Sequence, residues 1–378
     1  MRIGILTLPL HTNYGGILQA YALQTVLERM GYEVVVFDTP NKNFLPPIWK
    51  LPFSFSKRIV LKFLGKTNRV FIERYNNKVC SVITQNIKPF IDTYIHREEI
   101  RSFKNLKQED YYAIIVGSDQ VWRIIYFPGL WLGQQIENAY LDFAKKWNIK
   151  RIAYAASFGT ENWEYDEEQT KKCKILLRKF DAVSTREIDG VNLCKAKFEV
   201  DANHVLDPTM LLSMDDYMVL FQKTNTPKSE GTLLNYVLDD SQKIDSLINK
   251  VATDKHLVPF AVNNPFENDD SKPLQQRIKP SVETWLRGFY DAKFVITDSF
   301  HACVFSILFK KQFVVVGNKE RGISRIKSLL NMFELEDRLI DTDSDVSTLQ
   351  KIDYDNVYNI YDKFKESSMK YLFENLNS

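Results

Sequence analysis

Cysteine is scarce in this sequence, which has only four in 378 residues: Cys80, Cys173, Cys194 and Cys303. They stand alone, with no C-x-x-C pair and no histidine nearby at the spacing of a zinc site. We therefore expect reduced thiols rather than disulfides or zinc. The Walker loop, H-E-x-x-H and the EF-hand pattern are missing too, so the sequence predicts no bound metal.

An excess of charge of one sign is also missing, since 50 basic residues stand against 48 acidic ones. The net charge of +2 argues against a nucleic-acid protein built on bulk positive charge. No segment approaches the ~18 uninterrupted apolar residues of a transmembrane helix. The opening residues, 2–7, have a strand pattern rather than the layout of a signal peptide. We expect a soluble, cytoplasmic protein that binds no nucleic acid.

Short apolar runs alternate with helical patterns, which predicts βαβ units and parallel sheets with helices on both faces. The strands are expected at 2–7, 33–37, 112–116, 151–155, 180–184, 232–237, 257–262, 293–297 and 312–316. The helices are expected at 16–30, 166–179, 187–195, 241–254, 282–290, 300–310 and 322–332. A polar stretch at 223–231 is typical of a linker. We predict an α/β fold with two doubly wound, Rossmann-like domains, 1–222 and 231–352, separated by a cleft. A last helix within 353–378 is expected to pack back on the first domain.

Residues 42–78 differ from the rest, because nine basic residues stand there against a single acid, Glu73. Phenylalanines, a tryptophan and prolines are interleaved with them. Such a mixture suits an anionic membrane surface or an anionic ligand. A solvated helical insertion whose aromatic side chains complete the core is the other interpretation.

The most informative motif lies at residues 294–302, where an apolar strand pattern runs into Asp298, Ser299 and His301 before a helix. In an open α/β sheet, ligands bind outside the carboxyl ends of the strands. Imidazole exchanges protons near pH 7, and the helix that follows offers free N–H groups to an anion. The plainer alternative is that Ser299 caps the helix and His301 is structurally satisfied.

A similar junction follows the first strand, where Asn13, Gly15 and Gly16 precede a helix. Paired glycines let the backbone approach an anion, and Asn13 can hydrogen-bond a sugar or carboxylate. The glycines could equally serve only to shape the turn. The spacing is not G-x-G-x-x-G, so the dinucleotide fingerprint is absent.

Polar residues also follow the strand at 112–116, namely Asp119 and Gln120, with Trp122 beside them. A carboxylate and an amide next to an aromatic ring suit a sugar, because the ring stacks on its C–H face. Asp119 is also a candidate general base, or alternatively a helix cap.

Arginines follow two further strands. Arg186 comes after the strand at 180–184, and Arg321 and Arg325 come after the strand at 312–316. Guanidinium groups match the paired oxygens of a carboxylate or phosphate. Arg186 could instead pair with Glu187, and Arg325 could cover apolar surface.

Together these motifs resemble the polysaccharide pyruvyl transferase family. The matching segments follow the family's order over most of the chain: 3–5, 13–16, 19–20, 117–122, 154–159, 184–187, 206–209, 297–302 and 321–325. The resemblance implies a GT-B-like fold, with the acceptor on the first domain and the donor on the second. It implies transfer of a pyruvyl group from phosphoenolpyruvate to two hydroxyls of a sugar, with no cofactor.

The resemblance also implies roles for individual residues. His301 would be either the general acid or a hydrogen-bond partner of the donor phosphate, and Asp119 a candidate base. Arg186, Arg321 and Arg325 would be the partners of the donor's phosphate and carboxylate. The implied acceptor is a capsule or exopolysaccharide sugar, often lipid-linked at the inner face of the membrane. Residues 42–78 would then serve at that surface.

One residue departs from the family pattern: some members have an arginine two residues before the histidine, where this chain has Ser299. Either Arg321, Arg325 or Lys319 compensates, or the donor is not phosphoenolpyruvate. Two other functions remain open at this point. One is a glycosyltransferase that uses a nucleotide sugar, and the other is a non-catalytic carbohydrate-binding protein.

Overall fold

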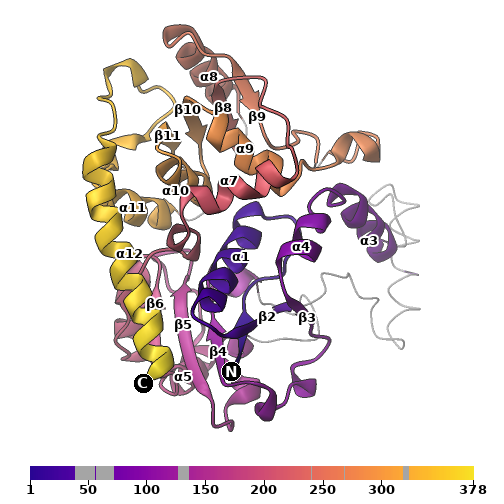
Figure 1. Ribbon diagram of the computed structural model, residues 1–378, viewed down its shortest axis with the longest axis vertical. Helices are drawn as coiled ribbons and strands as arrows, with labels where there is room; N and C mark the ends of the chain where they lie inside the picture. Colours follow the sequence, from indigo (N-terminus) through magenta and orange to yellow (C-terminus); the bar gives the residue numbers. More distant parts are fainter. Residues whose placement is uncertain (39–55, 57–71, 127–135, 240, 268, 318–322) are drawn as a thin grey trace.

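Two parallel sheets organise the chain (Figure 1). The computed structural model describes residues 1–38, 56, 72–126, 136–239, 241–267, 269–317 and 323–378. The first sheet has seven strands in the order β3-β2-β1-β4-β5-β6-β7. They are β1 (Arg2–Leu6), β2 (Glu33–Asp38), β3 (Arg97–Glu99), β4 (Ala113–Val116), β5 (Lys150–Ala156), β6 (Ala182–Thr185) and β7 (Asn203–His204).

The second sheet has five strands in the order β12-β11-β10-β8-β9, and all of its described pairs are parallel. They are β8 (Leu233–Tyr236), β9 (Pro259–Ala261), β10 (Phe294–Thr297), β11 (Gln312–Val316) and β12 (Leu339–Ile340). Central strands β4 and β10 are buried at every position, as continuous apolar runs in a parallel sheet require.

Helices cover both sheets and fill the space between them. They are α1 (Tyr14–Arg29), α3 (Ile72–Ile83), α4 (Lys88–Tyr94), α5 (Glu167–Leu177), α6 (Ile188–Leu193), α7 (Met214–Lys223), α8 (Gln242–Asp254), α9 (Val282–Asp291), α10 (Phe300–Leu308), α11 (Ile323–Met332) and α12 (Tyr354–Asn377). Every residue of α10 is buried, as expected for a helix that is apolar all round. Capping boxes at Asp166 and Ser213 start α5 and α7.

One apolar cluster runs without a break from α1 and β5 of the first sheet to α9, α10 and β11 of the second. Two smaller clusters fill the outer faces of the sheets. Helix α7 contributes to the shared cluster, because Tyr217 contacts Phe305 and Phe221 contacts Tyr290. The two sheets are therefore held together by a common core.

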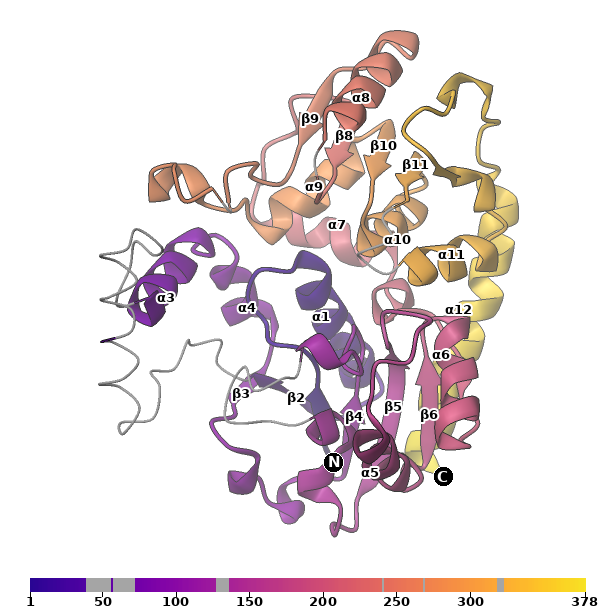
Figure 2. The same cartoon turned by 180° about the vertical axis from the view of Figure 1, so that it is seen from behind.

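Helix α12 runs along both halves of the molecule (Figures 1 and 2). Near its start, the Tyr358 hydroxyl donates to the Leu308 carbonyl at the end of α10 (2.8 Å). Near its end, the Tyr371 hydroxyl donates to the Ala153 carbonyl of β5 (3.0 Å). The chain thus returns to its first domain, and the two Rossmann-like halves adopt a GT-B-like arrangement.

The strands and helices expected from the sequence are all present, with ends that differ by a few residues. Sequence patterning did not predict α4, α7 or the short strands β3, β7 and β12. Most of the basic and aromatic segment 42–78 lies outside the described residues, and only the start of α3 overlaps it. Within the described part of the chain, no helix is both long and apolar enough to cross a membrane.

Two neighbouring residues of α12 test how much this helix contributes to stability. Leu372 is fully buried, whereas Phe373 is 59% exposed. We expect Leu372→Ala to lower the free energy of unfolding by about 2–5 kcal/mol, because it leaves a cavity in the shared core. Phe373→Ala is the control and should change it by about 0.5 kcal/mol or less. Equilibrium unfolding in urea measures both, and equal effects would contradict the packing described here.

Candidate active site

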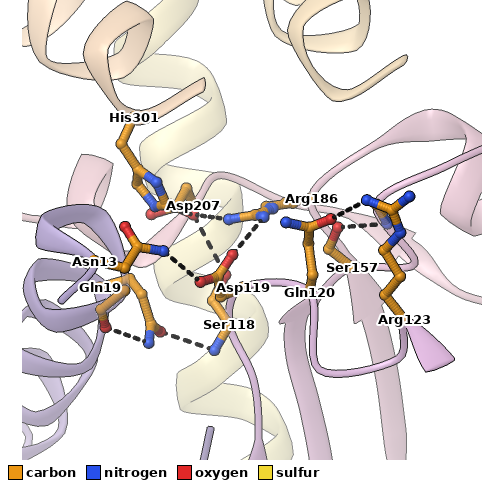
Figure 3. A network of polar contacts seen from close by, with 12 residues as sticks. Asn13, Gln19, Ser118, Asp119, Gln120, Arg123, Ser157, Arg186, Asp207 and His301 are labelled. Atoms are coloured by element: carbon orange, nitrogen blue, oxygen red, sulfur yellow. Dashed lines mark hydrogen bonds and ion pairs between the residues drawn. The ribbon is translucent and has the colours of Figure 1, made fainter. Parts of the chain in front are cut away.

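The site lies where both sheets reverse their strand order. In the first sheet the reversal falls between β1 and β4, whose following loops carry Asn13 and Asp119. In the second it falls between β8 and β10, and His301 comes just after β10. Such reversals open the sheet edge to a ligand. Two of them meet here, and Figure 3 shows the side chains that converge.

Arg186 lies at the centre of the group and joins two carboxylates. Its Nη2 donates to Asp119 Oδ1 (3.0 Å) and its Nη1 donates to Asp207 Oδ2 (2.9 Å) (Figure 3). The side chains of Arg186 and Asp207 are fully buried. A buried charge is tolerated only when it is paired and hydrogen-bonded, so these three groups depend on one another.

The environment shifts the pKa values of both carboxyl groups. Burial alone raises the pKa of Asp119, but Arg186, His301 and Arg325 together bring it below its usual value. Burial also raises the pKa of Asp207, which His301, Arg186 and the Thr209 hydrogen bonds lower in turn. Both groups are therefore carboxylates near neutral pH.

His301 faces this network from the second domain. Its Nε2 lies 3.8 Å from Asp207 Oδ2, too far for a hydrogen bond, and has no hydrogen-bond partner among the described residues. Only 7% of its side chain is exposed. Burial lowers the pKa of His301 below its usual value, although Asp207 and Asp119 oppose that shift. The ring is neutral near pH 7, with one nitrogen buried and unused.

Two arginines lie near the Phe300 ring, next to His301. The guanidinium carbon of Arg186 is 4.5 Å from the ring centroid and that of Arg325 is 5.7 Å away. Burial, together with the like charge of Arg186, lowers the pKa of Arg325 to about 10, so Arg325 remains charged. Its charge is held close to an imidazole, which is an arrangement suited to an anion that must receive a proton.

Backbone and side-chain hydrogen bonds hold Asp119 and Asp207 in place. The Asp119 carbonyl accepts from the Ser157 N–H (3.1 Å), and the Asn13 amide donates to Asp119 Oδ2 (3.4 Å). Asp207 caps a short turn, where its Oδ1 accepts from the Thr209 N–H (3.0 Å) and hydroxyl (2.7 Å). Ser118 Oγ lies 3.3 Å from Asp207 Oδ2. Asn13 is exposed, so the group meets solvent at this residue, whereas Asp119 itself is buried.

Helix α1 begins directly against the imidazole. A Cβ added at Gly15 would lie 2.0 Å from His301 Nδ1, so only glycine allows this approach. Gly16 lies beside Asn13 and Asp119, where an added Cβ would come no closer than 3.3 Å. The side chains of Asn13 and Ser299 make no capping bond to α1 and α10, the helices they precede. Neither side chain therefore satisfies the free N–H groups at the start of its helix.

Not every predicted site residue joins this group. Trp122 is fully buried, stacks on Tyr140 at 5.1 Å and donates from Nε1 to the Ala139 carbonyl (3.2 Å). Its predicted role as a sugar-stacking ring is therefore wrong. Asp298 accepts from the backbone N–H groups of Leu238 (2.9 Å) and Asp239 (3.1 Å), so it ties the β8 and β10 loops together instead of facing a substrate.

The remaining predictions have mixed outcomes. Gln120 is buried against Gly159 and accepts from Arg123 Nη1 (3.1 Å), beside the central group rather than in it. Arg186 is committed to two carboxylates, so it organises the site and is not the free anion clamp that was expected. Ser299 is half-buried at the start of α10. Arg321 lies outside the described residues.

Sequence reasoning missed the role of Asp207 and of Phe300. Asp207 lies within the matching segment 206–209, but the two-residue strand β7 before it is too short to predict, so no role is assigned to it from sequence. Phe300 has the pattern of an ordinary apolar residue of α10, and its position near two guanidinium groups depends on the meeting of the domains.

The fold and the site define a two-domain α/β protein with an imidazole buried among paired arginines and carboxylates. One solved structure that it resembles is the UDP-GlcNAc 2-epimerase from Neisseria meningitidis, with 11% identity, coverage of 99% of this chain and 100% of that chain, and a TM-score of 0.46. Another is the UDP-GlcNAc 2-epimerase from Methanocaldococcus jannaschii, with 10% identity, coverage of 96% of this chain and 92% of that chain, and a TM-score of 0.44. An ADP-bound heptosyltransferase from E. coli is also similar, with 13% identity, coverage of 96% of this chain and 100% of that chain, and a TM-score of 0.39. At these values the likeness carries no information on function. No curated protein matches.

A family model for polysaccharide pyruvyl transferases matches residues 13–320, which include the described residues of the site except Arg325. The chain belongs to the polysaccharide pyruvyl transferase family, and so to a family of transferases. A sugar acceptor follows from that membership.

Replacing Gly15 tests the contact between α1 and the imidazole. We expect Gly15→Ala to displace the ring towards water, which raises the pKa of His301 towards its ordinary value because burial is what lowers it. NMR titration of histidine-labelled protein measures this pKa, and His301→Gln identifies the signal. Gly16→Ala is the control and should shift the pKa much less. An unchanged His301 signal in Gly15→Ala would contradict the contact.

Removing the central arginine tests the charge network. Arg186→Met should lower the free energy of unfolding by about 3–5 kcal/mol at pH 8, since it leaves Asp119 and Asp207 buried without their cation. Losing Arg186 raises the pKa of both carboxyl groups in the folded variant, so they take up protons as pH falls. The difference in the free energy of unfolding between wild type and Arg186→Met, measured in urea, should therefore shrink as the pH falls from 8 to 5.

The matched control is Arg178→Met, which breaks an ion pair with Glu199 at the surface. Its loss of stability should be much smaller and independent of pH over the same range. A deficit in Arg186→Met that stays constant or grows towards pH 5 would refute the network.

Proposed function

We propose that this protein transfers a pyruvyl group from phosphoenolpyruvate to two hydroxyls of a sugar during assembly of a capsule or exopolysaccharide. The observation that supports this most is the buried, unpartnered Nε2 of His301 beside the charged Arg325. Proton transfer to the methylene carbon of an enol phosphate needs an acid and an anion site close together.

In the empty site His301 is neutral, because burial lowers its pKa. An anionic donor would add negative charge next to the ring and so favour its protonated form. The acid would thus be available when the donor is bound. Arg325 and the N-termini of α1 and α10 would hold the donor's charged groups, with Arg321 as a further partner.

The reaction can then be written with His301 as its central group. Nε2 gives its proton to the donor's methylene carbon while a sugar hydroxyl attacks the adjacent carbon, and that hydroxyl's proton passes to the imidazole. The second hydroxyl closes the ring as the carbon–oxygen bond to phosphate breaks, and its proton leaves with phosphate. Asp119 is a weak base, because its pKa is lowered and it accepts from Arg186 and Asn13. It is better suited to positioning the acceptor.

The acceptor in this proposal is a sugar that is carried on a lipid at the inner membrane surface. The basic and aromatic residues of 42–78 would attract anionic lipid headgroups there. Ser299 leaves the charge of the donor to be balanced by Arg325, Arg321 and Lys319. The protein would act in the cytoplasm, peripherally at the membrane, without a cofactor.

The direct test is phosphate release from phosphoenolpyruvate in the presence of galactosides and mannosides, with mass spectrometry to detect a pyruvyl ketal. His301→Gln should lower kcat by about 10²–10⁴-fold, because it removes the general acid. His256→Asn is the matched control, since His256 is exposed and distant in sequence from the site motifs. Full turnover by His301→Gln would refute its role.

Thermal-shift measurements distinguish the remaining functions. Stabilisation by UDP or GDP compounds, but not by phosphoenolpyruvate, would make the protein a glycosyltransferase. Sugar binding without turnover across the whole acceptor series would make it a carbohydrate-binding protein. Either result contradicts pyruvyl transfer.

A further inference from the structure

A cavity opens between α6 of the first domain and α11 of the second, which are neighbours in the fold (Figure 2). Its volume is about 450 Å³, within the range of small-molecule sites. Residues 324, 328 and 331 share one face of α11 and line it. Arg325, one residue on from Ser324, lies near Phe300 in the site described above.

The cavity and the active site share a wall. Ile188 lines the cavity, and the residue before it, Glu187, is fully buried. Arg325 is close enough to Glu187 to lower the pKa of its carboxyl group, which burial raises overall. A ligand in the cavity would therefore be separated from the reacting groups by this one layer of side chains.

The lining is polar on one side and apolar on the other. Ser324 is 4% exposed, and its hydroxyl oxygen is buried with no partner among the described residues. The Ser328 hydroxyl accepts from the Ile188 N–H (3.0 Å), so it is oriented by the other domain. The Ile188 side chain is 47% exposed.

The cavity lining carries more negative than positive charge, whereas a site for an anionic donor is expected to be positive. Three carboxylates, Glu161, Asp189 and Glu336, line the cavity against one ammonium group, Lys327. That balance disfavours phosphate, nucleotides and pyruvate-like anions. The described residues contain no cluster of three groups that could hold a metal ion. Carboxylates, an amide and hydroxyls beside aliphatic side chains match the polar edge and C–H face of a neutral sugar.

We propose that this cavity binds a neutral sugar ring of the acceptor glycan, at a position along the chain away from the ring that reacts. The carboxylates and the Asn331 amide would bond its hydroxyls, and Ile188 would contact its C–H face. The inference deepens the proposed function and rests on it only in requiring a glycan acceptor. It predicts that the protein distinguishes long acceptors from short ones by binding.

Binding without any donor tests this directly. The probes are neutral galactoside and mannoside oligomers of one to four rings, titrated by calorimetry. We expect at least one longer oligomer to bind wild type about tenfold or more tightly than its single ring. Ile188→Trp fills the cavity and should abolish that gain. Ile175→Trp is the matched control, since Ile175 is an isoleucine of α5 that is 56% exposed and outside the cavity lining.

Three outcomes would overturn the proposal. They are no gain in affinity with oligomer length, the same gain in Ile188→Trp as in wild type, and competition for the cavity by inorganic phosphate or UDP. None depends on phosphoenolpyruvate. If the length-dependent gain disappears in Ile188→Trp while phosphate release is not observed, the cavity assignment stands and the donor is wrong.

Discussion

The structure depends on one buried guanidinium group. Arg186 joins Asp119, from the loop after β4, to Asp207, from the turn after β7, and all three side chains are out of reach of water. Each charge is tolerable only because of the others. The group therefore fixes the carboxyl edge of the first sheet, and His301 approaches this fixed edge from the second domain.

For His301 to reach this edge, the two domains must keep a fixed position relative to each other. The shared apolar cluster and helix α12 hold them together, and α10, which carries His301, is buried along its whole length. Gly15 allows α1 to touch the imidazole without a clash. His301 is therefore placed by rigid elements, and the exposed Asn13 is where this group of side chains meets solvent.

The candidate active site and the cavity between α6 and α11 differ in charge. Arg325 lies near Phe300 in the first, and Ser324, next to it in the chain, lines the second. One helix can contribute to both because successive residues point about 100° apart around its axis. In our proposals the first holds the anionic donor and the reacting ring, and the second holds a neutral ring further along the acceptor.

The sequence by itself determined the class of fold and most of its elements, because apolar periodicity depends on local burial alone. It also identified the loops that carry Asn13, Asp119, Arg186 and His301, since each follows a recognisable strand. Tertiary structure decided what those residues do. It took Trp122 into the core and committed Arg186 to two carboxylates. It also brought in Asp207, which follows a strand too short to predict. Burial and pairing of polar groups depend on which segments meet, and that meeting is not encoded in any one stretch of the chain.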